Sequence, residues 1–339
     1  MAYYFNLPII TQLTTDQQAA VDETESLALS GGPGTGKSVV CLWRHIRNYA
    51  TNSKKSLLLT YTKTLEHYLK QSALSQNQES SNNIDRTFWW LSHNAENYDE
   101  IIIDEGQDVS IDKYNRIKTY SNKISYGADD AQSLYEEGCS PIELENLFPN
   151  NEEYTMHKNF RNSKEILLFT RSIFPTILIP QSTINSSTET DLKPIIKITG
   201  WDKDEELKQI ISIINDFSGD THNIGILVPS QRAVREYYEL IRNKLDSSTT
   251  CTKYEGEMQN FQGLSGIHIT TYKSSKGTEF DTVIIPNFDS FDWMINNEEI
   301  PITEKDYYVA FTRTKTNLFL ICKRNPNKGA SGTFEIEQI

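Results

Sequence analysis

The stretch Gly31-Gly-Pro-Gly-Thr-Gly-Lys37-Ser38 decides the class of fold. It follows an apolar run at residues 26–31 and precedes the amphipathic segment VVCLWRHIRNY at residues 39–49. A loop of the pattern G-x-x-x-x-G-K-[ST] between a strand and a helix closes backbone N–H groups around phosphates, and the helix dipole adds positive potential. We expect Lys37 to reach the β- and γ-phosphates and Ser38 to bind Mg²⁺. The loop residues expected to contact a nucleotide are Gly32, Gly34, Thr35, Gly36, Lys37 and Ser38.

Short apolar runs recur along the chain, with helical patterns between them. They lie at residues 26–31, 56–61, 100–105 and 123–128, and again at 195–200, 223–230, 267–274, 282–288 and 317–322. Such runs are typical of parallel strands covered by helices on both faces. We predict an α/β fold with two tandem domains, residues 1–152 and 153–339, each built on a mostly parallel sheet. The polar stretches 71–86 and 181–194 are predicted to be loops.

Composition narrows the class of protein. The 339 residues include 33 Lys and Arg against 46 Asp and Glu, a net charge of -13. This balance disfavours a protein that binds nucleic acid over its whole surface, but it allows a narrow basic groove. Four dispersed cysteines without a CxxC pair indicate reduced thiols. The N-terminal sequence lacks the features of a signal peptide and no run is long enough to span a bilayer, so we expect a cytoplasmic protein that does not bind membranes.

The run EIIID at residues 100–104 ends in Asp104, and Glu105 follows it. A nucleotide hydrolase needs one carboxylate to hold the metal ion and a neighbouring one to activate the attacking water. We assign the metal role to Asp104 and the base role to Glu105. An acidic pair after a strand is more often a helix N-cap or a solvated end, so the assignment depends on the phosphate loop upstream.

Together these residues give the chain a resemblance to superfamily 1 helicases of the UvrD/Rep type, from about Leu13 to Leu320. The blocks that carry it keep the family's order: LTTDQQAAV (13–21), TYTKT (60–64), DEGQD (104–108), ADDAQSLY (128–135), HKNFRNSKEIL (157–167), IHITTYKSSKGTEF (267–280) and EKDYYVAFTRTK (304–315). The resemblance implies two RecA-like domains. The short spacing between the blocks leaves no room for the large inserted accessory domains of processive relatives.

The resemblance also implies roles in binding and cleaving ATP. In the first domain, Gln17 would contact the adenine edge and Gln132 would lie near the γ-phosphate, although Gln18 replaces a commoner arginine. In the second domain, Phe160 would stack on adenine and Arg161 would reach the γ-phosphate. The second domain's remaining implied residues are Gly277 and Glu279, with Glu279 on the ribose, and Arg313 as a second arginine finger. An arginine finger contributes about 10³ to 10⁵ in rate.

The resemblance places Tyr61 against a base, and Thr271 and Lys273 on the nucleic-acid backbone. Base stacking is sequence-tolerant, which suits a motor. Two departures weaken this assignment: acidic Glu136-Glu137 replaces an aromatic and an arginine that contact DNA in the family, and Lys273 replaces a histidine. The adjacent Trp89 and Trp90 are expected to pack against the protein.

The resulting hypothesis is a motor or helicase that needs ATP and Mg²⁺ and acts on single-stranded DNA, moving 3′ to 5′ by analogy. One alternative is an ATP-gated regulatory subunit of a nuclease or a defence complex, with little translocation. Another is an RNA motor. Stimulation of ATP hydrolysis by DNA or by RNA separates these hypotheses.

Overall fold

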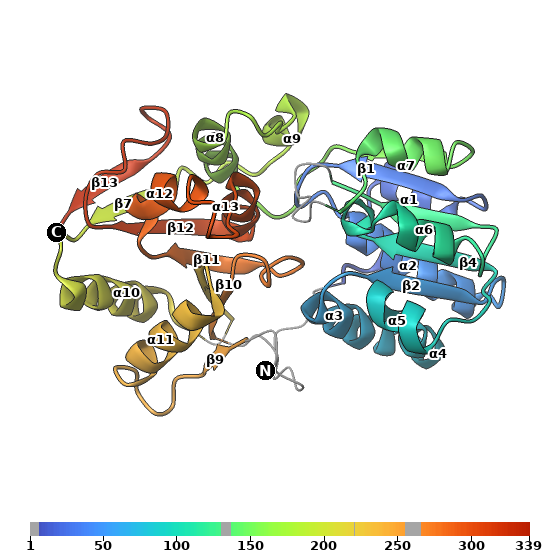
Figure 1. The fold of residues 1–339 in the computed structure, drawn as a ribbon, viewed down its shortest axis with the longest axis horizontal. Helices are drawn as coiled ribbons and strands as arrows, with labels where there is room; N and C mark the ends of the chain where they lie inside the picture. The colour runs from blue at the N-terminus through green and yellow to red at the C-terminus, as the bar shows by residue number, and fades with distance from the viewer. Residues whose placement is uncertain (1–6, 130–136, 220, 255–265) are drawn as a thin grey trace. The chain divides into compact units, whose positions relative to one another are not determined.

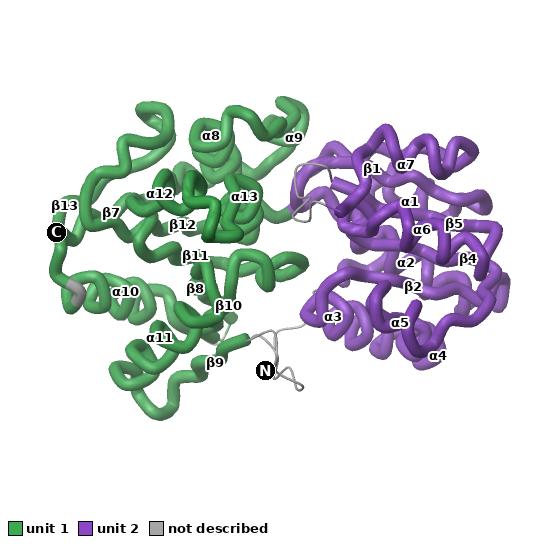
Figure 2. Tube along the Cα trace, viewed as in Figure 1, with its two compact units in different colours: residues 1–3, 161–339 green, residues 4–160 purple. Residues whose placement is uncertain are grey.

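The computed structural model describes residues 7–129, 137–219, 221–254 and 266–339. Its contacts divide the chain into two compact units, one ending at Phe160 and one beginning at Arg161 (Figure 2). In the sequence this division falls beyond the predicted boundary at residue 152. The reason is that strand β6 (Glu152–Met156) pairs with β1 (Leu27–Gly31) along its whole length, and β6 therefore belongs to the first unit.

The first unit contains a six-stranded sheet in the order β3-β2-β4-β5-β1-β6. All pairings between these strands are parallel. Strand β1, which leads into the phosphate loop, is separated by one strand from β4, which ends at Asp104. The other strands are β2 (Ser56–Thr60), β3 (Ile84–Arg86), β4 (Glu100–Asp104) and β5 (Ile124–Gly127).

Helices cover both faces of this sheet, and the central strands alternate between the two cores. Leu58 and Ile102 pack in the core under α1 (Thr15–Asp22), α2 (Lys37–Ala50) and α3 (Lys63–Leu74). Their neighbours Leu57, Leu59, Ile101 and Ile103 lie in the core with α5 (Thr87–His93), α6 (Ile111–Ile117) and α7 (Pro141–Leu147). Burial on both faces explains the continuous apolar runs. Short elements complete the unit: η1 (Ile10–Gln12), α4 (Gln78–Asn82) and η2 (Gly106–Asp108).

The second unit contains a seven-stranded sheet in the order β13-β7-β12-β11-β8-β10-β9, again with parallel pairings (Figure 1). Its strands are β7 (Ile195–Ile198), β8 (Ile224–Val228), β9 (Cys251–Lys253), β10 (Ile267–Thr271), β11 (Phe280–Ile285), β12 (Thr314–Cys322) and β13 (Glu335–Gln338).

Two different cores stabilise this second sheet. Isoleucines of β8 and β10 pack with α10 (Lys203–Phe217) and α11 (Gln231–Arg242) in an aliphatic core. A cluster of aromatic rings involves α8 (Lys164–Ile173), α12 (Phe291–Ile295) and α13 (Glu304–Phe311), with Phe311 5.2 Å from Phe174 and 5.8 Å from Phe169 between ring centroids. The remaining short helices are α9 (Gln181–Asn185) and η4 (Phe288–Ser290).

The predicted α/β class, with two RecA-like domains and mostly parallel sheets, is confirmed. The prediction that residues 71–86 and 181–194 are loops is wrong, because they contain α4, β3 and α9. Asn77 caps α4 by accepting a hydrogen bond from the Ser80 amide, so polar residues start this helix. Among the described residues, no helix combines the length and apolar character needed to cross a bilayer.

Candidate nucleotide site

The phosphate loop joins the carboxyl end of β1 to the amino end of α2. Gly34 and Gly36 have φ values of +68° and +88°, in the left-handed region that favours glycine. A Cβ atom on Gly36 would lie 2.5 Å from Nε2 of Gln17, so a larger residue there would also displace the Gln17 side chain. Gly36 is also the N-cap of α2. The loop therefore presents the start of α2 as the motif predicts.

The side chains of Lys37 and Thr35 fold back onto the loop. Nζ of Lys37 donates to the carbonyl oxygens of Gly31 and Gly32 at 2.7 and 2.9 Å, and Oγ1 of Thr35 donates to Gly32 O at 2.8 Å. Lys37 also lies 3.5 Å from a carboxylate oxygen of the buried Asp129. No role is predicted for Asp129 from the sequence. Its position two residues after β5, at the same sheet edge as the loop, is the signal that could have identified it.

Gln17 supports the loop from helix α1. Its Oε1 accepts a hydrogen bond from the Thr14 amide at 3.0 Å, and its Nε2 donates to Thr35 O at 3.1 Å. The side chain is buried, and both ends of the amide are engaged within the protein. The contact with adenine remains a prediction.

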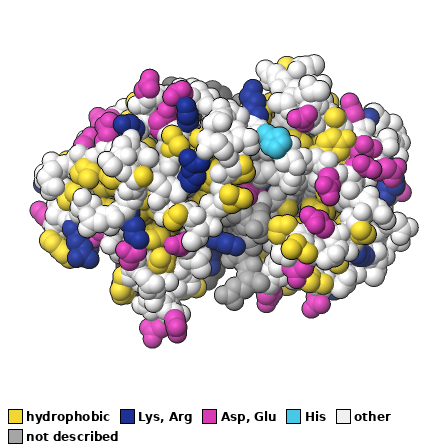
Figure 3. Space-filling model, turned by 90° about the horizontal axis from the view of Figure 1, so that it is seen from above, with side chains coloured by type: hydrophobic (Ala, Val, Ile, Leu, Met, Phe, Trp, Pro, Cys, Tyr) yellow, Lys and Arg dark blue, Asp and Glu magenta, His cyan; other side chains and the backbone are white. Residues whose placement is uncertain are grey.

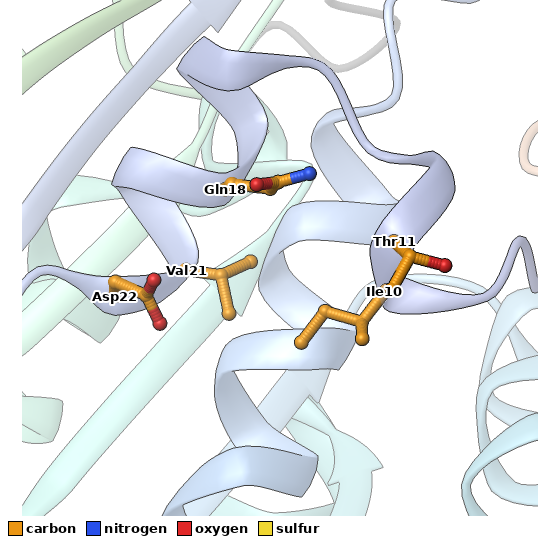
Figure 4. A pocket seen from close by; sticks show the side chains of 5 residues that line it. All are labelled: Ile10, Thr11, Gln18, Val21 and Asp22. Atoms are coloured by element: carbon orange, nitrogen blue, oxygen red, sulfur yellow. The ribbon is translucent and has the colours of Figure 1, made fainter.

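The next residue, Gln18, faces another way. It lines a shallow depression of about 390 Å³ with Ile10, Thr11, Val21 and Asp22 (Figure 4). Its Nε2 donates to Leu13 O at 2.8 Å. None of the phosphate-loop residues lines this depression. Gln17 therefore contacts the phosphate loop, whereas Gln18 lies at a separate surface.

Asp104 ends β4 opposite Gly127, the last residue of β5. A Cβ atom on Gly127 would lie 3.6 Å from Cβ of Lys37 and 3.7 Å from Oδ1 of Asp104, so Gly127 lies beside both residues. Burial and the adjacent Glu105 carboxylate raise the pKa of Asp104 to about 7, although a hydrogen bond from the Ser38 side chain acts to lower it.

These residues fit a magnesium ion. Oδ2 of Asp104 is buried and has no hydrogen-bond partner among the described residues, which is unfavourable unless another group supplies one. Ser38 and Asp104, the two predicted metal residues, contact each other through their side chains. Hydroxyl and carboxylate oxygens are ligands that Mg²⁺ prefers.

A buried amide connects the acidic pair to the neighbouring strand. Glu105 has a left-handed φ of 59°, and its Oε2 accepts a hydrogen bond from Nε2 of Gln107 at 2.6 Å. Oε1 of Gln107 accepts one from the Asp129 amide at 3.0 Å. Gln107 therefore fixes the Glu105 carboxylate relative to the segment after β5. Gln132, further along that segment, lies outside the described residues.

In the second unit, Glu279 is the centre of a charge cluster. One carboxylate oxygen lies 3.2 Å from Nε of Arg161, and the other lies 3.2 Å from Nζ of Lys315. Lys315 is also 3.6 Å from Asp281. The structure thus brings together the predicted residues Glu279 and Arg161, and it adds Lys315, for which no role is predicted from the sequence.

Arg313 is buried, with 1% of its surface exposed. Its Nε donates to Val309 O at 3.0 Å, and one terminal nitrogen donates to Thr278 O at 3.4 Å. These bonds link the end of α13 to the loop that contains Gly277, whose φ is +85°. Phe160 is 52% exposed, with Nζ of Lys158 5.1 Å from its ring centroid. The catalytic role of Arg313 and the stacking role of Phe160 remain predictions.

The predicted nucleic-acid residues lie at carboxyl ends of strands. Tyr61 directly follows β2, with Nζ of Lys113 5.8 Å from its ring centroid. Thr271 ends β10 and accepts a hydrogen bond from the Ser274 amide, while Nζ of Lys273 lies 4.0 Å from Asp306. On the face shown in Figure 3, acidic and basic side chains of the described residues are interspersed.

The tryptophan pair after β3 divides between core and surface. Trp90 is 1% exposed and packs in the core, as predicted. Trp89 is 43% exposed and stacks on His93 at 3.9 Å between ring centroids.

Comparison with known families adds an independent observation. Residues 245–325 match the family model described as "UvrD-like helicase C-terminal domain". The resemblance to superfamily 1 helicases of the UvrD/Rep type is confirmed. The match covers the K-G-x-E block and the block around Arg313, so these parts of the second unit are similar to the C-terminal domain of UvrD-like helicases. No curated protein matches the chain.

Several solved structures resemble the chain. The C-terminal domain of a possible DNA helicase from Lactobacillus plantarum WCFS1 is 16% identical, with a TM-score of 0.39, and the match covers 52% of this chain and 98% of that one. An arterivirus nonstructural protein 10 helicase in complex with DNA is 14% identical, with a TM-score of 0.45, over 90% of this chain and 62% of that one. The PRRSV helicase is 12% identical, with a TM-score of 0.46, and the match covers 91% of this chain and 54% of that one. The chain thus spans less than two thirds of the length of either viral helicase.

Proposed function

We propose that the protein is an ATP-dependent motor that uses Mg²⁺, translocates on single-stranded DNA and acts as a helicase in the 3′ to 5′ direction. The observation that carries the proposal is the meeting of Lys37, Ser38 and Asp104 at one sheet edge, in a chain whose residues 245–325 also match the UvrD-like helicase C-terminal domain. The proposed location is the cytoplasm, where the four free cysteines would stay reduced.

In this proposal the first unit binds the phosphates and the metal ion. The loop amides and Lys37 bind the β- and γ-phosphates, and Ser38 and Asp104 are the residues that would hold Mg²⁺. The ion would supply positive charge that offsets the charge developing on the phosphate oxygens. Glu105, oriented by Gln107, accepts the proton of the attacking water. Gln17 contacts the adenine edge, and Gln132 lies near the γ-phosphate.

The second unit contributes arginine fingers. Arg161 and Arg313 stabilise negative charge in the transition state, and Glu279 binds the ribose beside Gly277. Phe160, the last residue of the first unit, stacks on adenine. The ion pair between Arg161 and Glu279 supports this grouping, because it keeps a cation and a ribose-binding carboxylate within 3.2 Å of each other. Removing either arginine should slow hydrolysis by orders of magnitude.

Tyr61, Thr271 and Lys273 form the proposed contacts with the strand. Their positions at carboxyl ends of strands support this, since ligands of open α/β sheets bind at that edge. Replacing Tyr61 with alanine should weaken binding of single-stranded DNA by about 1 to 3 kcal/mol, the contribution of one stacked base.

The test is steady-state ATP turnover with Mg²⁺, measured without polymer, with single-stranded DNA, with RNA and with a 3′-tailed duplex whose separation is followed in parallel. We expect stimulation by DNA and separation of the duplex. Stimulation by RNA alone would indicate an RNA motor. Equal turnover in all four conditions would refute the motor function.

Two variants test the nucleotide site. Lys37→Ala should abolish turnover while the protein stays folded. Arg161→Ala should bind ATP with nearly unchanged affinity but hydrolyse it at least about 10³-fold more slowly. Wild-type turnover by Lys37→Ala would refute the ATPase proposal. Wild-type turnover by Arg161→Ala would refute only the proposed role of Arg161 as an arginine finger.

A further inference from the structure

Hydrogen bonds to its backbone carbonyl oxygens hold the phosphate loop in place. Every carbonyl oxygen from Gly31 to Gly36 accepts a hydrogen bond from elsewhere in the first unit. The donors are Lys37 for Gly31 and Gly32, Asn159 for Pro33, the Phe160 amide for Gly34, Gln17 for Thr35 and the Val40 amide for Gly36.

Two of these donors come from a distant part of the sequence. Nδ2 of Asn159 donates to Pro33 O at 2.6 Å, and the Phe160 amide donates to Gly34 O at 2.9 Å. Asn159 is 3% exposed, so its amide makes this bond away from water. Consecutive residues of one segment thus bind consecutive carbonyls at the tip of the loop.

This arrangement controls where the loop amides point. In a planar trans peptide the C=O and N–H groups point in opposite directions. Binding the carbonyls of Pro33 and Gly34 to the 159–160 segment therefore turns the N–H groups of Gly34 and Thr35 away from that segment. Backbone N–H groups at such positions bind phosphate oxygens in loops of this type.

We propose that Asn159 is a positioning residue for phosphate binding: it acts through the Pro33 peptide to hold the Gly34 amide in its phosphate-binding orientation. The inference rests on the proposed function and adds a residue to it. In this proposal Asn159 acts only through its hydrogen bond to Pro33 O, without contacting the phosphates. Arg161 lies two residues further along, so the segment that orients the loop also carries the proposed arginine finger.

The test replaces the donor with a group of the same size. Asn159→Asp keeps the shape of the side chain but puts a carboxylate oxygen against the Pro33 carbonyl. The matched control is Asn151→Asp in the same unit. Nδ2 of Asn151 donates to Leu27 O and Ile124 O, both at 2.9 Å, near the amino ends of β1 and β5. Each variant loses a side-chain amide that donates to backbone carbonyl oxygens, but only the amide of Asn159 donates to the phosphate loop.

Equilibrium binding of ATP, ADP and AMP with Mg²⁺ is the primary measurement, together with KM and kcat for ATP hydrolysis. Asn159→Asp should weaken ATP and ADP binding about tenfold, the usual effect of one lost hydrogen bond on an equilibrium, and should raise KM by a similar factor. Its kcat should stay within about twofold of wild type. Asn151→Asp should lower the melting temperature and leave nucleotide affinity unchanged.

Several results would overturn the inference. Wild-type ADP affinity in Asn159→Asp would do so, as would equal weakening in both variants, which would indicate a general loss of folding. If Asn159→Asp fails to fold, Asn159→Ala removes the donor without adding charge and permits the same comparison. Failure of the wild-type protein to bind either nucleotide would instead overturn the proposed function, and this inference with it.

Discussion

A buried ion pair joins helix α2 to the first residue of β4 in the first unit. Nε of Arg44 lies 2.7 Å from Oε1 of Glu100, and these side chains are 2% and 0% exposed. Glu100 also accepts hydrogen bonds from Ser125 at 2.7 Å and Asn48 at 3.0 Å. Burial acts to raise the pKa of Glu100, but Arg44, the Ser125 hydroxyl and Lys54 together hold that pKa below its ordinary value.

Glu100→Gln removes the negative charge and keeps the shape. Breaking a buried pair by neutralising one partner costs about 3 to 5 kcal/mol, because the other charge stays buried. Arg44 retains hydrogen bonds to the carbonyl oxygens of Ala20, Glu23 and Glu25, so we expect a loss near the lower end, about 3 kcal/mol. For a unit of this size the melting temperature should fall by about 6 to 12 °C.

The assay is denaturant unfolding of wild type and Glu100→Gln across a range of pH. A carboxylate with a lowered pKa contributes stability that is fully present above its unfolded-state pKa and is lost as pH falls through the lower folded-state pKa. The difference between the proteins should therefore be full at pH 7 and shrink below about pH 4.5. A difference under about 1 kcal/mol at pH 7, or one that stays constant down to about pH 3, would refute the reasoning. Lys123→Gln is the control, since its partner Glu25 is 59% exposed and the pair should contribute less than about 1 kcal/mol.

Two further predictions follow from local geometry. Gly36→Ala should weaken nucleotide binding in a direct titration and destabilise the first unit by about 1 kcal/mol or more, because its φ is +88° and a Cβ would lie 2.5 Å from Nε2 of Gln17; unchanged affinity would contradict the packing argument. Trp90→Phe should change the free energy of unfolding by less than about 1.5 kcal/mol, because Nε1 of Trp90 has no hydrogen-bond partner among the described residues. Trp90→Ala should cost about 3 to 5 kcal/mol. Equal losses in the two variants would contradict this prediction.

The sequence pattern predicts the central strands of each sheet but not its edge strands. The nine predicted strands correspond to the central strands of the two sheets, β1, β2, β4 and β5 and then β7, β8, β10, β11 and β12. The strands without a prediction are β3, β6, β9 and β13, which are the four edge strands. A central parallel strand is covered on both faces and is therefore mostly apolar. An edge strand has one neighbour and more exposure, so β6 with the sequence EEYTM and β13 with EIEQ carry no apolar signal.

The same physical distinction explains which site residues the sequence could reveal. Residues predicted to meet phosphate or metal, such as Lys37, need a particular chemical group at a fixed spacing, so a motif identifies them. Gln107 and Asn159 instead donate hydrogen bonds to other protein atoms. Any donor that reaches the same carboxylate or carbonyl oxygen could replace them, so no fixed motif identifies them.

Their location depends on which strand ends are neighbours, which is set by sheet order and not by spacing along the chain. Asn159 follows β6, and β6 pairs with β1, so the segment after β6 emerges beside the phosphate loop. Because β6 is an edge strand without an apolar signal, the pairing that brings Asn159 to Pro33 could not be inferred from the sequence. One missed edge strand thus accounts for the unit boundary at Phe160, for the contacts at the tip of the loop and for the absence of Asn159 from the predicted site.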